Sequence, residues 1–335
     1  MRIMTVIDLK VGYSCNDACI HCVVDDFRDA LRNKHMKQDK TFTEIAQEMR
    51  SARTRGDLLV ITGGEPTIRQ DFWDIVKLAK QLKYNIMLQS NGRAFANWEF
   101  AKHLTEYSDI FNFCIALHGP NAQIHERITQ RTGSYEETVQ GLKNICKLGF
   151  SYSGKIVISR QNFQVLVEIA EKFVQLQAAS VDIAFPHAQG RASKMWEQVV
   201  PRYKEVSKYV RQAAQYLLNQ KTNVRLETFP FCTVPGYENL VSEVFQQTQA
   251  YAEINQYGSD YGASNWSELR PRIKEKFAPC LSCRFNLICE GPWNEYAYRY
   301  GGEEFKPIYG ERIRDVRQVA DLSFLRQFAN SGKLI

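Results

Sequence analysis

The sequence lacks the features of a membrane-spanning, secreted or repeat protein. No apolar run approaches the ~20 residues that a helix needs to cross a bilayer. The N-terminal residues contain no long apolar segment followed by a small-residue cleavage site, so no secretory signal is visible. A repeat of fixed period and a strong low-complexity segment are absent as well. We therefore expect a cytoplasmic protein without a membrane partner.

A large excess of one charge sign is also missing. The 335 residues include 43 Lys and Arg and 37 Asp and Glu, which gives a formal net charge of +6. This excess is too small to indicate a nucleic-acid partner, although it is compatible with an anionic ligand or a polar peptide. Hydrophobic residues make up 44% and charged residues 24%, so the chain can form a large core and is not globally disordered.

Short β-branched runs alternate with amphipathic helical patterns up to about residue 190. The runs predict strands at 5–11, 58–62, 85–89, 110–117, 155–159 and 181–185. The patterns between them predict helices at 42–53, 71–82, 98–106, 135–148 and 165–176. Six repeated β/α units imply parallel strands joined by right-handed crossovers. The expected fold is α/β, with an open or partial (β/α)6 barrel whose site lies beyond the C-terminal ends of the strands.

The pattern changes after residue 190. A Gln-rich helical pattern covers about residues 197–220, and a strand-like run follows at 223–227. We therefore divide the chain into a partial barrel at residues 1–190, a helical connector at 191–225 and a smaller α+β domain at 226–335.

Six of the nine cysteines fall in two tight groups. An odd number in a chain expected to be cytoplasmic makes a disulfide framework the weaker interpretation. The first group, Cys15, Cys19 and Cys22, has the spacing C-x3-C-x2-C directly after the first predicted strand. Three thiolates leave one position of a metal centre open for a substrate or cofactor, whereas a structural zinc site is normally closed by four ligands. The alternative is zinc, with His21 or another residue as the fourth ligand.

Small and polar residues follow the next two strands. They are Gly63, Gly64, Glu65 and Pro66 after the second strand, and Ser90, Asn91 and Gly92 at the end of the third. Glycines let backbone groups come close to a ligand, and a glutamate there can accept hydrogen bonds from an ammonium group. For Ser90 and Asn91 the alternative is a turn with local side-chain caps.

Together, the C-x3-C-x2-C loop and the Gly-Gly-Glu-Pro turn resemble the two signatures of the radical S-adenosylmethionine (SAM) superfamily. The resemblance implies a [4Fe–4S] cluster on Cys15, Cys19 and Cys22, whose open iron chelates the amino and carboxylate groups of SAM. An electron from this cluster would cleave SAM and give a 5′-deoxyadenosyl radical, which abstracts a hydrogen from the substrate. The resemblance further implies cofactor contacts from His21, Gly63, Gly64, Glu65, Pro66, Ser90, Asn91 and, past the fifth strand, Asn162.

The fourth predicted strand departs from the pattern of similar peptide-modifying enzymes. Those enzymes often carry Ser-x-Asp-Gly here and an Arg soon after, whereas this chain has Ala116, His118 and Thr129 in those places. Cys114, Ala116 and His118 share one face of the strand because side chains alternate. If that face is the barrel interior, Cys114 or His118 could exchange a proton or hydrogen with the substrate. The alternative is a buried core cysteine and a structural histidine.

The second group of cysteines, Cys280, Cys283 and Cys289, has the spacing C-x2-C-x5-C. Cys232 offers a fourth thiolate, since Cys114 and Cys146 lie inside the first domain, and four thiolates can close a site around an iron–sulfur cluster or zinc. Beside a radical SAM domain, this spacing resembles the SPASM and Twitch extensions, which carry auxiliary [4Fe–4S] clusters. The full SPASM pattern adds a cysteine where this chain has Trp293. The resemblance therefore implies one auxiliary cluster in a shortened, Twitch-like domain.

Extensions of this type accompany radical SAM enzymes that mature ribosomally made peptides. The resemblance implies hydrogen abstraction from a precursor peptide or protein, which leads to a crosslink, an epimerised residue or the excision of a residue fragment. It also implies a flavodoxin- or ferredoxin-type reductant and, since the chain begins at the first strand, leader recognition that is absent or supplied by a separate protein. Two other classes stay open: a small-molecule dehydrogenase of the aminocyclitol type and a non-catalytic iron–sulfur or zinc protein.

Overall fold

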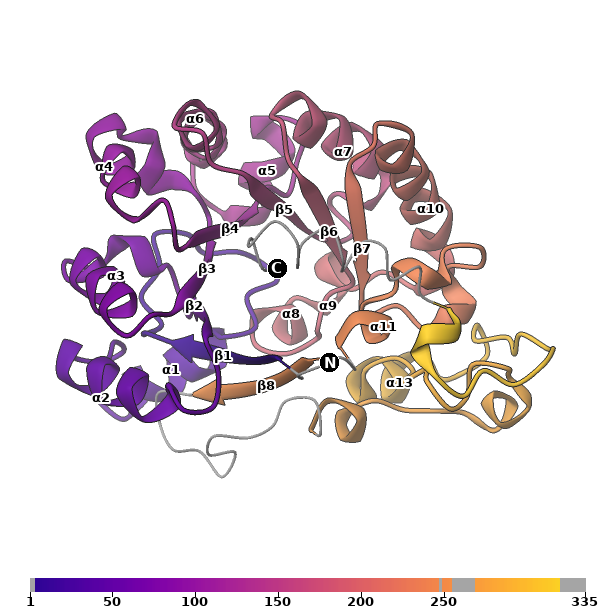
Figure 1. Ribbon diagram of the computed structural model, residues 1–335. Helices are drawn as coiled ribbons and strands as arrows, with labels where there is room; N and C mark the ends of the chain where they lie inside the picture. The colour runs from indigo at the N-terminus through magenta and orange to yellow at the C-terminus, as the bar shows by residue number, and fades with distance from the viewer. Residues whose placement is uncertain (1–3, 247–248, 255–268, 320–335) are drawn as a thin grey trace.

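The structure is a computed structural model and describes residues 4–246, 249–254 and 269–319. A parallel eight-stranded sheet curves around its centre, and helices cover the outside of the sheet (Figure 1). The strands are β1 Met4–Lys10, β2 Leu58–Thr62, β3 Asn85–Ser90, β4 Phe111–Ala116, β5 Tyr152–Val157, β6 Ser180–Ala184, β7 Asn223–Glu227 and β8 Gln249–Ile254. Their order is β7-β6-β5-β4-β3-β2-β1-β8, so β7 and β8 are the two edges of an open barrel.

The predicted α/β partial barrel is confirmed, and two further strands extend it. β7 continues the parallel order beside β6. β8, which the sequence pattern did not predict, pairs with β1 in parallel, with Met4 opposite Gln249. It comes from a part of the chain that we assigned to the C-terminal domain. The division of the chain at residues 190 and 225 stays a prediction.

Most predicted helices are present within a few residues of their expected bounds. They are α2 Phe42–Ala52, α3 Phe72–Gln81, α4 Trp98–Lys102, α6 Ser134–Lys147, α7 Leu166–Gln175 and α10 Tyr203–Asn219. The sequence pattern did not predict α1 Asp25–Asn33, α5 Ala122–Thr129, α8 Arg191–Lys194, α11 Ser242–Gln246 and α13 Asn294–Tyr300. Within the described ranges, no helix combines the length and apolar character needed to cross a bilayer.

The single helix expected at 197–220 is divided into α9 Trp196–Val199 and α10. Pro201 explains the break, because the residue before a proline is pushed out of the helical region. Val200 accordingly has φ −94° and ψ 101°. By contrast, α2 begins as its sequence indicates, since Thr41 and Glu44 form a capping box at its first turn.

The two faces of the sheet have different surroundings. Residues such as Ile7, Leu59 and Ile86 are fully buried in the main core with the covering helices. Their neighbours Val6, Leu58 and others point to the opposite face and form a small separate cluster with Cys114. Because this face is the inner one, Cys114 faces the interior of the barrel.

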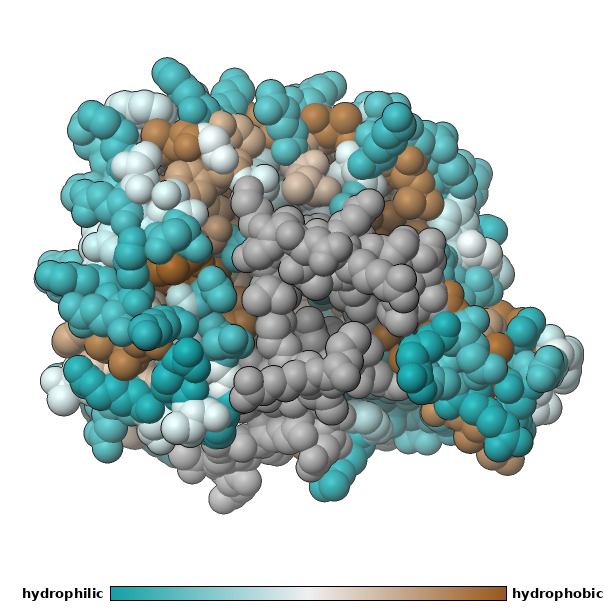
Figure 2. Space-filling view, viewed as in Figure 1, coloured by the Kyte–Doolittle hydropathy of each residue, from teal (hydrophilic) through white to brown (hydrophobic). Residues whose placement is uncertain are grey.

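In the space-filling view, hydrophilic side chains dominate the outer helices and hydrophobic ones lie between them (Figure 2).

The barrel interior is ionic on its β5–β7 side. Lys155 on β5 pairs with Glu227 on β7, and Arg225 on β7 pairs with Asp182 on β6 and, at 3.3 Å, with Glu227. The interiors of parallel β/α barrels are usually filled by branched apolar residues. Because buried charges cost free energy, each of these charged groups depends on its ionic partners.

The C-terminal segment is joined to the barrel by a buried ionic network. The Lys274 ammonium lies 2.8 Å from Glu243 on α11 and 2.9 Å from Glu290, and Arg270 also binds Glu290. Burial raises the pKa of Glu290, but Arg270 and Lys274 outweigh it, so this pKa lies below its ordinary value. All four side chains are nearly inaccessible to solvent, so each charge depends on its partners.

Lys274→Met should destabilise the protein strongly, by about 3–5 kcal/mol, because it leaves the Glu243 charge buried without its cation. The measurement is the midpoint of urea unfolding of the full chain, followed by tryptophan fluorescence. The double variant Lys274→Met/Glu243→Gln is the control, since Glu290 keeps Arg270 and no lone buried charge is left. A double variant that is no more stable than the single one would show that the ion pair is not the cause.

Candidate active site

A cavity of about 470 Å³ opens at the C-terminal ends of the strands. It brings together most of the predicted site residues: Cys15, Cys19, His21, Cys22, Gly63, Gly64, Glu65, Ser90, Asn91 and Cys114. Pro66 and Asn162 are buried nearby but do not line it. The cavity thus joins the loop after β1, the turn after β2 and the ends of β3 and β4, which are distant in the sequence.

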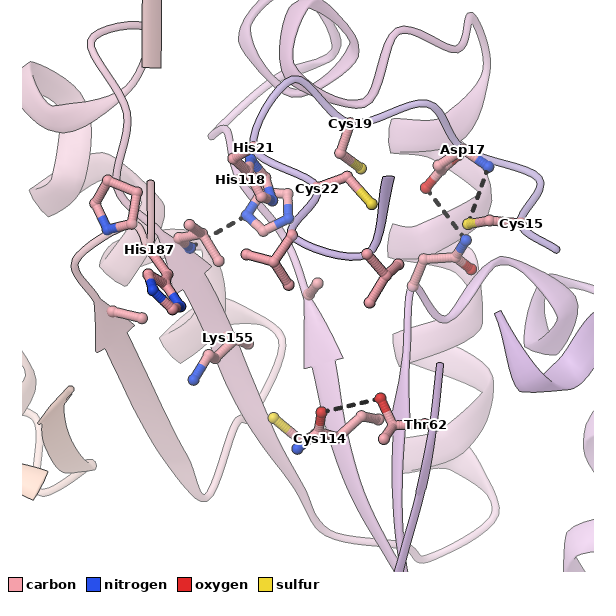
Figure 3. Close-up of a pocket in the computed structure, with 18 of the residues that line it drawn as sticks. Cys15, Asp17, Cys19, His21, Cys22, Thr62, Cys114, His118, Lys155 and His187 are labelled. Atoms are coloured by element: carbon pink, nitrogen blue, oxygen red, sulfur yellow. Dashed lines mark hydrogen bonds between the residues drawn. The ribbon is translucent and has the colours of Figure 1, made fainter. Parts of the chain in front are cut away.

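The cysteines after β1 form one side of this cavity. Figure 3 shows the sulfur atoms of Cys15, Cys19 and Cys22 turned toward a shared space. Burial raises the pKa of Cys15 to about 12 and that of Cys19 well above its ordinary value. Burial also raises the pKa of Cys22, while the cation of Arg28 opposes this rise. Buried thiols become thiolates when a positively charged metal centre compensates their charge, so this donor set fits an iron–sulfur cluster.

The turn after β2 packs directly on the cysteine loop. The Gly64 N–H donates to the Gly12 carbonyl, and the Glu65 N–H donates to the Ser14 carbonyl, both at 2.8 Å. A Cβ atom on Gly63 would lie 2.1 Å from the Gly12 oxygen, and one on Gly64 would lie equally close to the Ser14 oxygen. Because Gly63 and Gly64 have no side chains, they make room for the backbone of the cysteine loop. The sequence alone did not reveal this reason for the two glycines.

Glu65 ties the ends of β2 and β3 together from a buried position. Its carboxylate accepts hydrogen bonds from the Ser90 hydroxyl at 2.8 Å and the Asn91 N–H at 2.7 Å, and further ones from Thr67. Burial raises the pKa of Glu65, and these donors oppose the rise. Ser90 and Asn91 also cap the following turn by accepting from Gly92 and Arg93. Local capping and a position at the cavity therefore occur together at this turn.

Asp17 is a site residue that the sequence analysis missed. It lies inside the cysteine loop and is buried, and its carboxylate accepts from Arg93 at 2.6 Å and from the Asn91 amide at 3.2 Å. Arg93 also donates to the Asn16 carbonyl at 2.8 Å. These contacts fix the loop against the end of β3. The only signal in the sequence is an acidic residue between two cysteines.

His118 is a neutral hydrogen-bonding residue in this structure. Its Nδ1 atom accepts from the Val157 N–H at 3.3 Å, which places the ring proton on Nε2. Burial, with the neighbouring His21 and His125, lowers the pKa of His118 well below its ordinary value. The His21 ring stands edge-on to His118 at 4.6 Å between centroids, and its buried Nδ1 atom has no hydrogen-bond partner among the residues that the structure describes.

Asn162 supports this histidine from outside the cavity. Its amide donates to the His118 and Val157 carbonyls, both at 3.0 Å, and its oxygen accepts from the Ser159 N–H at 2.7 Å. These protein contacts occupy both the oxygen and the nitrogen of the Asn162 amide. The contact to ribose that the resemblance implied for Asn162 stays a prediction.

The floor of the cavity lies deeper in the barrel. Cys114 and Lys155 project from β4 and β5 below the cysteine loop (Figure 3). Burial, followed by the Asp182 carboxylate, raises the pKa of Cys114 to about 12, so this thiol keeps its proton near neutral pH. Lys155 remains charged, because Glu227 and Asp182 outweigh the effect of burial on its pKa. A protonated thiol and an ion pair therefore face the space below the cysteine loop.

Part of the cavity wall comes from the segment after residue 190. Trp293, which stands where a SPASM domain has a cysteine, stacks on His187 with 3.9 Å between ring centroids and 14° between planes. Both residues line the cavity, and the buried Nε1 atom of Trp293 lacks a hydrogen-bond partner within the described part of the chain. Motif spacing marked position 293 only as that of a missing cysteine and gave no signal for His187, because the two rings meet only in the folded chain.

The second group of cysteines lies at a separate cavity. Cys232, which follows β7, lines it together with Cys280, Cys283 and Cys289. Burial raises the pKa of Cys232 to about 12 and that of Cys289 to about 11. Four thiols with this chemistry fit a thiolate-bound cluster. Among the residues that the structure describes, no three His, Cys, Asp or Glu side chains lie in a position to hold a single metal ion.

Comparisons with known proteins agree with this geometry. A family model for the radical SAM superfamily matches residues 9–173. The mycofactocin maturase MftC of Mycolicibacterium smegmatis is 29% identical over 193 residues, which cover 57% of this chain and 47% of the relative. This chain thus spans about half the length of the curated relatives that it matches.

Solved structures show the same fold. SuiB of Streptococcus suis bound to S-adenosylmethionine aligns with a TM-score of 0.63 and 14% identity, over 91% of this chain and 76% of SuiB. Native anSMEcpe with bound AdoMet and Cp18Cys peptide aligns with a TM-score of 0.62 and 11% identity, over 98% of both chains. The matched family model covers both the cysteine loop and the turn after β2, and it identifies residues 9–173 as a radical SAM domain.

Proposed function

We propose that this protein is a radical SAM enzyme that modifies a ribosomally made peptide or protein. The observation that carries the proposal is the meeting of Cys15, Cys19 and Cys22 with the Glu65–Asn91 network at one cavity. The family implies a [4Fe–4S] cluster and SAM as cofactors. When bound, they supply a 5′-deoxyadenosyl radical that abstracts a hydrogen from the substrate.

The residues around the cavity have distinct roles in this proposal. The three cysteines would hold the cluster. Glu65 lines the cavity and would accept hydrogen bonds from the ammonium group of SAM, and Ser90 and Asn91 would contact the polar groups of SAM. Gly63 and Gly64 let the turn approach the cysteine loop closely enough for these contacts.

The substrate then lies between SAM and the barrel floor. Cys114 holds a proton on its sulfur at this floor, next to the Lys155–Glu227 pair. This pair can bind polar groups such as peptide amides or a carboxylate. His187 and Trp293 form a flat aromatic wall on the side of the second cysteine group. The cavity can therefore take a polar segment of a peptide.

Several observations favour a peptide over a small molecule. One relative is named a maturase, and one aligned structure holds a bound peptide. The four cysteines of the second group would hold an auxiliary cluster, as in enzymes of this kind. A flavodoxin- or ferredoxin-type reductant and a cytoplasmic location belong to the same proposal.

The test uses the full chain, reconstituted anaerobically with iron and sulfide and reduced with dithionite. Adding SAM should change the EPR signal of the reduced cluster, and 5′-deoxyadenosine should form. A low-molecular-mass extract of the native cells should increase that formation, and treating the extract with a protease should abolish the increase.

Two results would contradict parts of the proposal. An EPR signal that does not respond to SAM would exclude radical SAM chemistry at this site. An increase that survives the protease would instead favour a small-molecule substrate, such as that of an aminocyclitol dehydrogenase.

A further inference from the structure

Helix α1 places a buried arginine against one of the cluster cysteines. The Nη2 atom of Arg28 lies 3.7 Å from the Cys22 sulfur, with its N–H directed at that sulfur. Arg28 is only 6% exposed, so water screens its charge weakly. Neither the cysteine motif nor the roles proposed above account for this guanidinium.

Two further residues hold Arg28 in place. The Asp25 carboxylate accepts from Arg28 and from Arg191 on α8, each at 2.7 Å. Two guanidinium groups thus share one carboxylate beside Cys22, so these three side chains together carry one net positive charge. Lys194, which also approaches this carboxylate, is exposed to solvent and pairs with Asp26 and Asp29 on the outer side of α1. Solvent and salt screen those outer charges.

The segment that contains Gly190 and Arg191 also contacts the cysteine loop directly. The Arg191 N–H donates to the Cys22 carbonyl at 2.9 Å, and its side chain donates to the Ala18 carbonyl. The preceding Gly190 has φ +60°, and a Cβ atom there would lie 2.4 Å from the Cys22 oxygen. The positions of Arg28 and Arg191 relative to Cys22 are therefore fixed by backbone contacts as well as by charge.

We propose that Arg28, held by Asp25 and Arg191, raises the reduction potential of the cluster bound by Cys15, Cys19 and Cys22. Reduction adds one negative charge to the cluster. A nearby cation and an N–H group directed at a ligand sulfur stabilise the reduced form more than the oxidised form. The inference rests on the proposed function, since it requires a cluster on these three cysteines. Arg28 is a positioning residue here and takes no part in bond breaking.

The consequence concerns the electron donor. A cluster with a raised potential accepts an electron more readily from a protein reductant of moderate potential. The same cation reduces the driving force for passing the electron on to SAM, since ΔG changes with the potential difference. Arg28 therefore balances two successive electron transfers.

The experiment is an anaerobic redox titration of the reconstituted full chain, followed by the EPR signal that responds to SAM. Arg28→Gln should shift the midpoint potential to more negative values, and Arg28→Lys should give a smaller shift in the same direction. Asp25→Asn, which removes the negative charge and keeps the shape, should shift it to more positive values. Arg32→Gln is the matched control, because Arg32 lies on the same helix but is exposed, and it should leave the potential unchanged.

The opposite shifts separate an electrostatic role from a merely structural one. Damage to the cysteine loop would not shift the midpoint potential in opposite directions in the Arg28→Gln and Asp25→Asn variants. If Arg28→Gln fails to hold a cluster, the comparison of Arg28→Lys with Asp25→Asn decides. Equal potentials in a wild type and variants that all show the SAM-responsive signal would overturn the inference and leave the proposed function intact. A wild type without such a signal would overturn both.

Discussion

Replacing Cys15, Cys19 and Cys22 together by alanine should lower the iron content from about eight to about four atoms per chain, as expected for two [4Fe–4S] clusters of which one is lost. The EPR signal that responds to SAM should disappear, and formation of 5′-deoxyadenosine should stop. The physical reason is that these three sulfurs line the shared cavity with Glu65 and are the ligands of the proposed cluster. The measurements are an iron and sulfide count, EPR with and without SAM, and chromatography of the nucleoside.

Cys146→Ala is the matched control for the triple variant. Cys146 lies on α6, away from both cavities, and its thiol donates to the Leu176 carbonyl. Its loss should leave both the iron content and the response to SAM unchanged. Zinc in place of iron, or a SAM-responsive signal that persists in the triple variant, would contradict the assignment of the first cluster.

Replacing Cys280 and Cys283 by alanine should have the complementary effect. About four irons should again be lost, but the SAM-responsive signal and the cleavage of SAM should remain. Both cysteines line the second cavity together with Cys232 and Cys289. This cavity is separate from the one that Cys15 lines. Conversion of the substrate should fall, because the auxiliary cluster would accept an electron from the substrate radical or help to hold the substrate.

A Cys232→Ala variant tests the fourth ligand independently. It should lower the iron content of the second site as the double variant does, because the four thiols share one cavity. Zinc bound at this site, or an iron content that Cys232→Ala leaves unchanged, would contradict the assignment.

Much of the fold followed from local periodicity. Strands such as β2 and β7 begin and end at the residues that the pattern predicted. β2 is a short apolar run with clear limits, as buried strands of a parallel sheet are, whereas β7 is an edge strand in which the buried Val224 and Leu226 alternate with polar residues. Helix α1 was missed for the opposite reason. Its buried residues are Asp25, Arg28 and Leu31, so two of the three are charged and the apolar period of a helix is weak. The sequence alone did not indicate what the charges of this helix contact.

The residues of the candidate site also fall into two groups: those that the sequence marked and those that only the folded chain brings together. Cys15, Cys19 and Cys22 could be recognised because three ligands of one centre lie within a single loop. Cys232 could only be added by elimination, and its place beside Cys289 required the folded chain. Asp17 and His187 had no motif to mark them, and Trp293 was marked only as the place of a missing SPASM cysteine, although all three line the first cavity.

The sequence by itself determined the radical SAM signatures, the alternation of strands and helices and the end of the sheet at which the site lies. These features depend on neighbours along the chain, and the chemistry of thiols, glycines and period-two strands expresses them directly. The tertiary structure decided that Cys114 and Lys155 face the cavity, that Trp293 closes it, and that Arg28 contacts Cys22. Those contacts join segments far apart in the chain or on elements of weak periodicity, so only packing of the whole barrel brings them together.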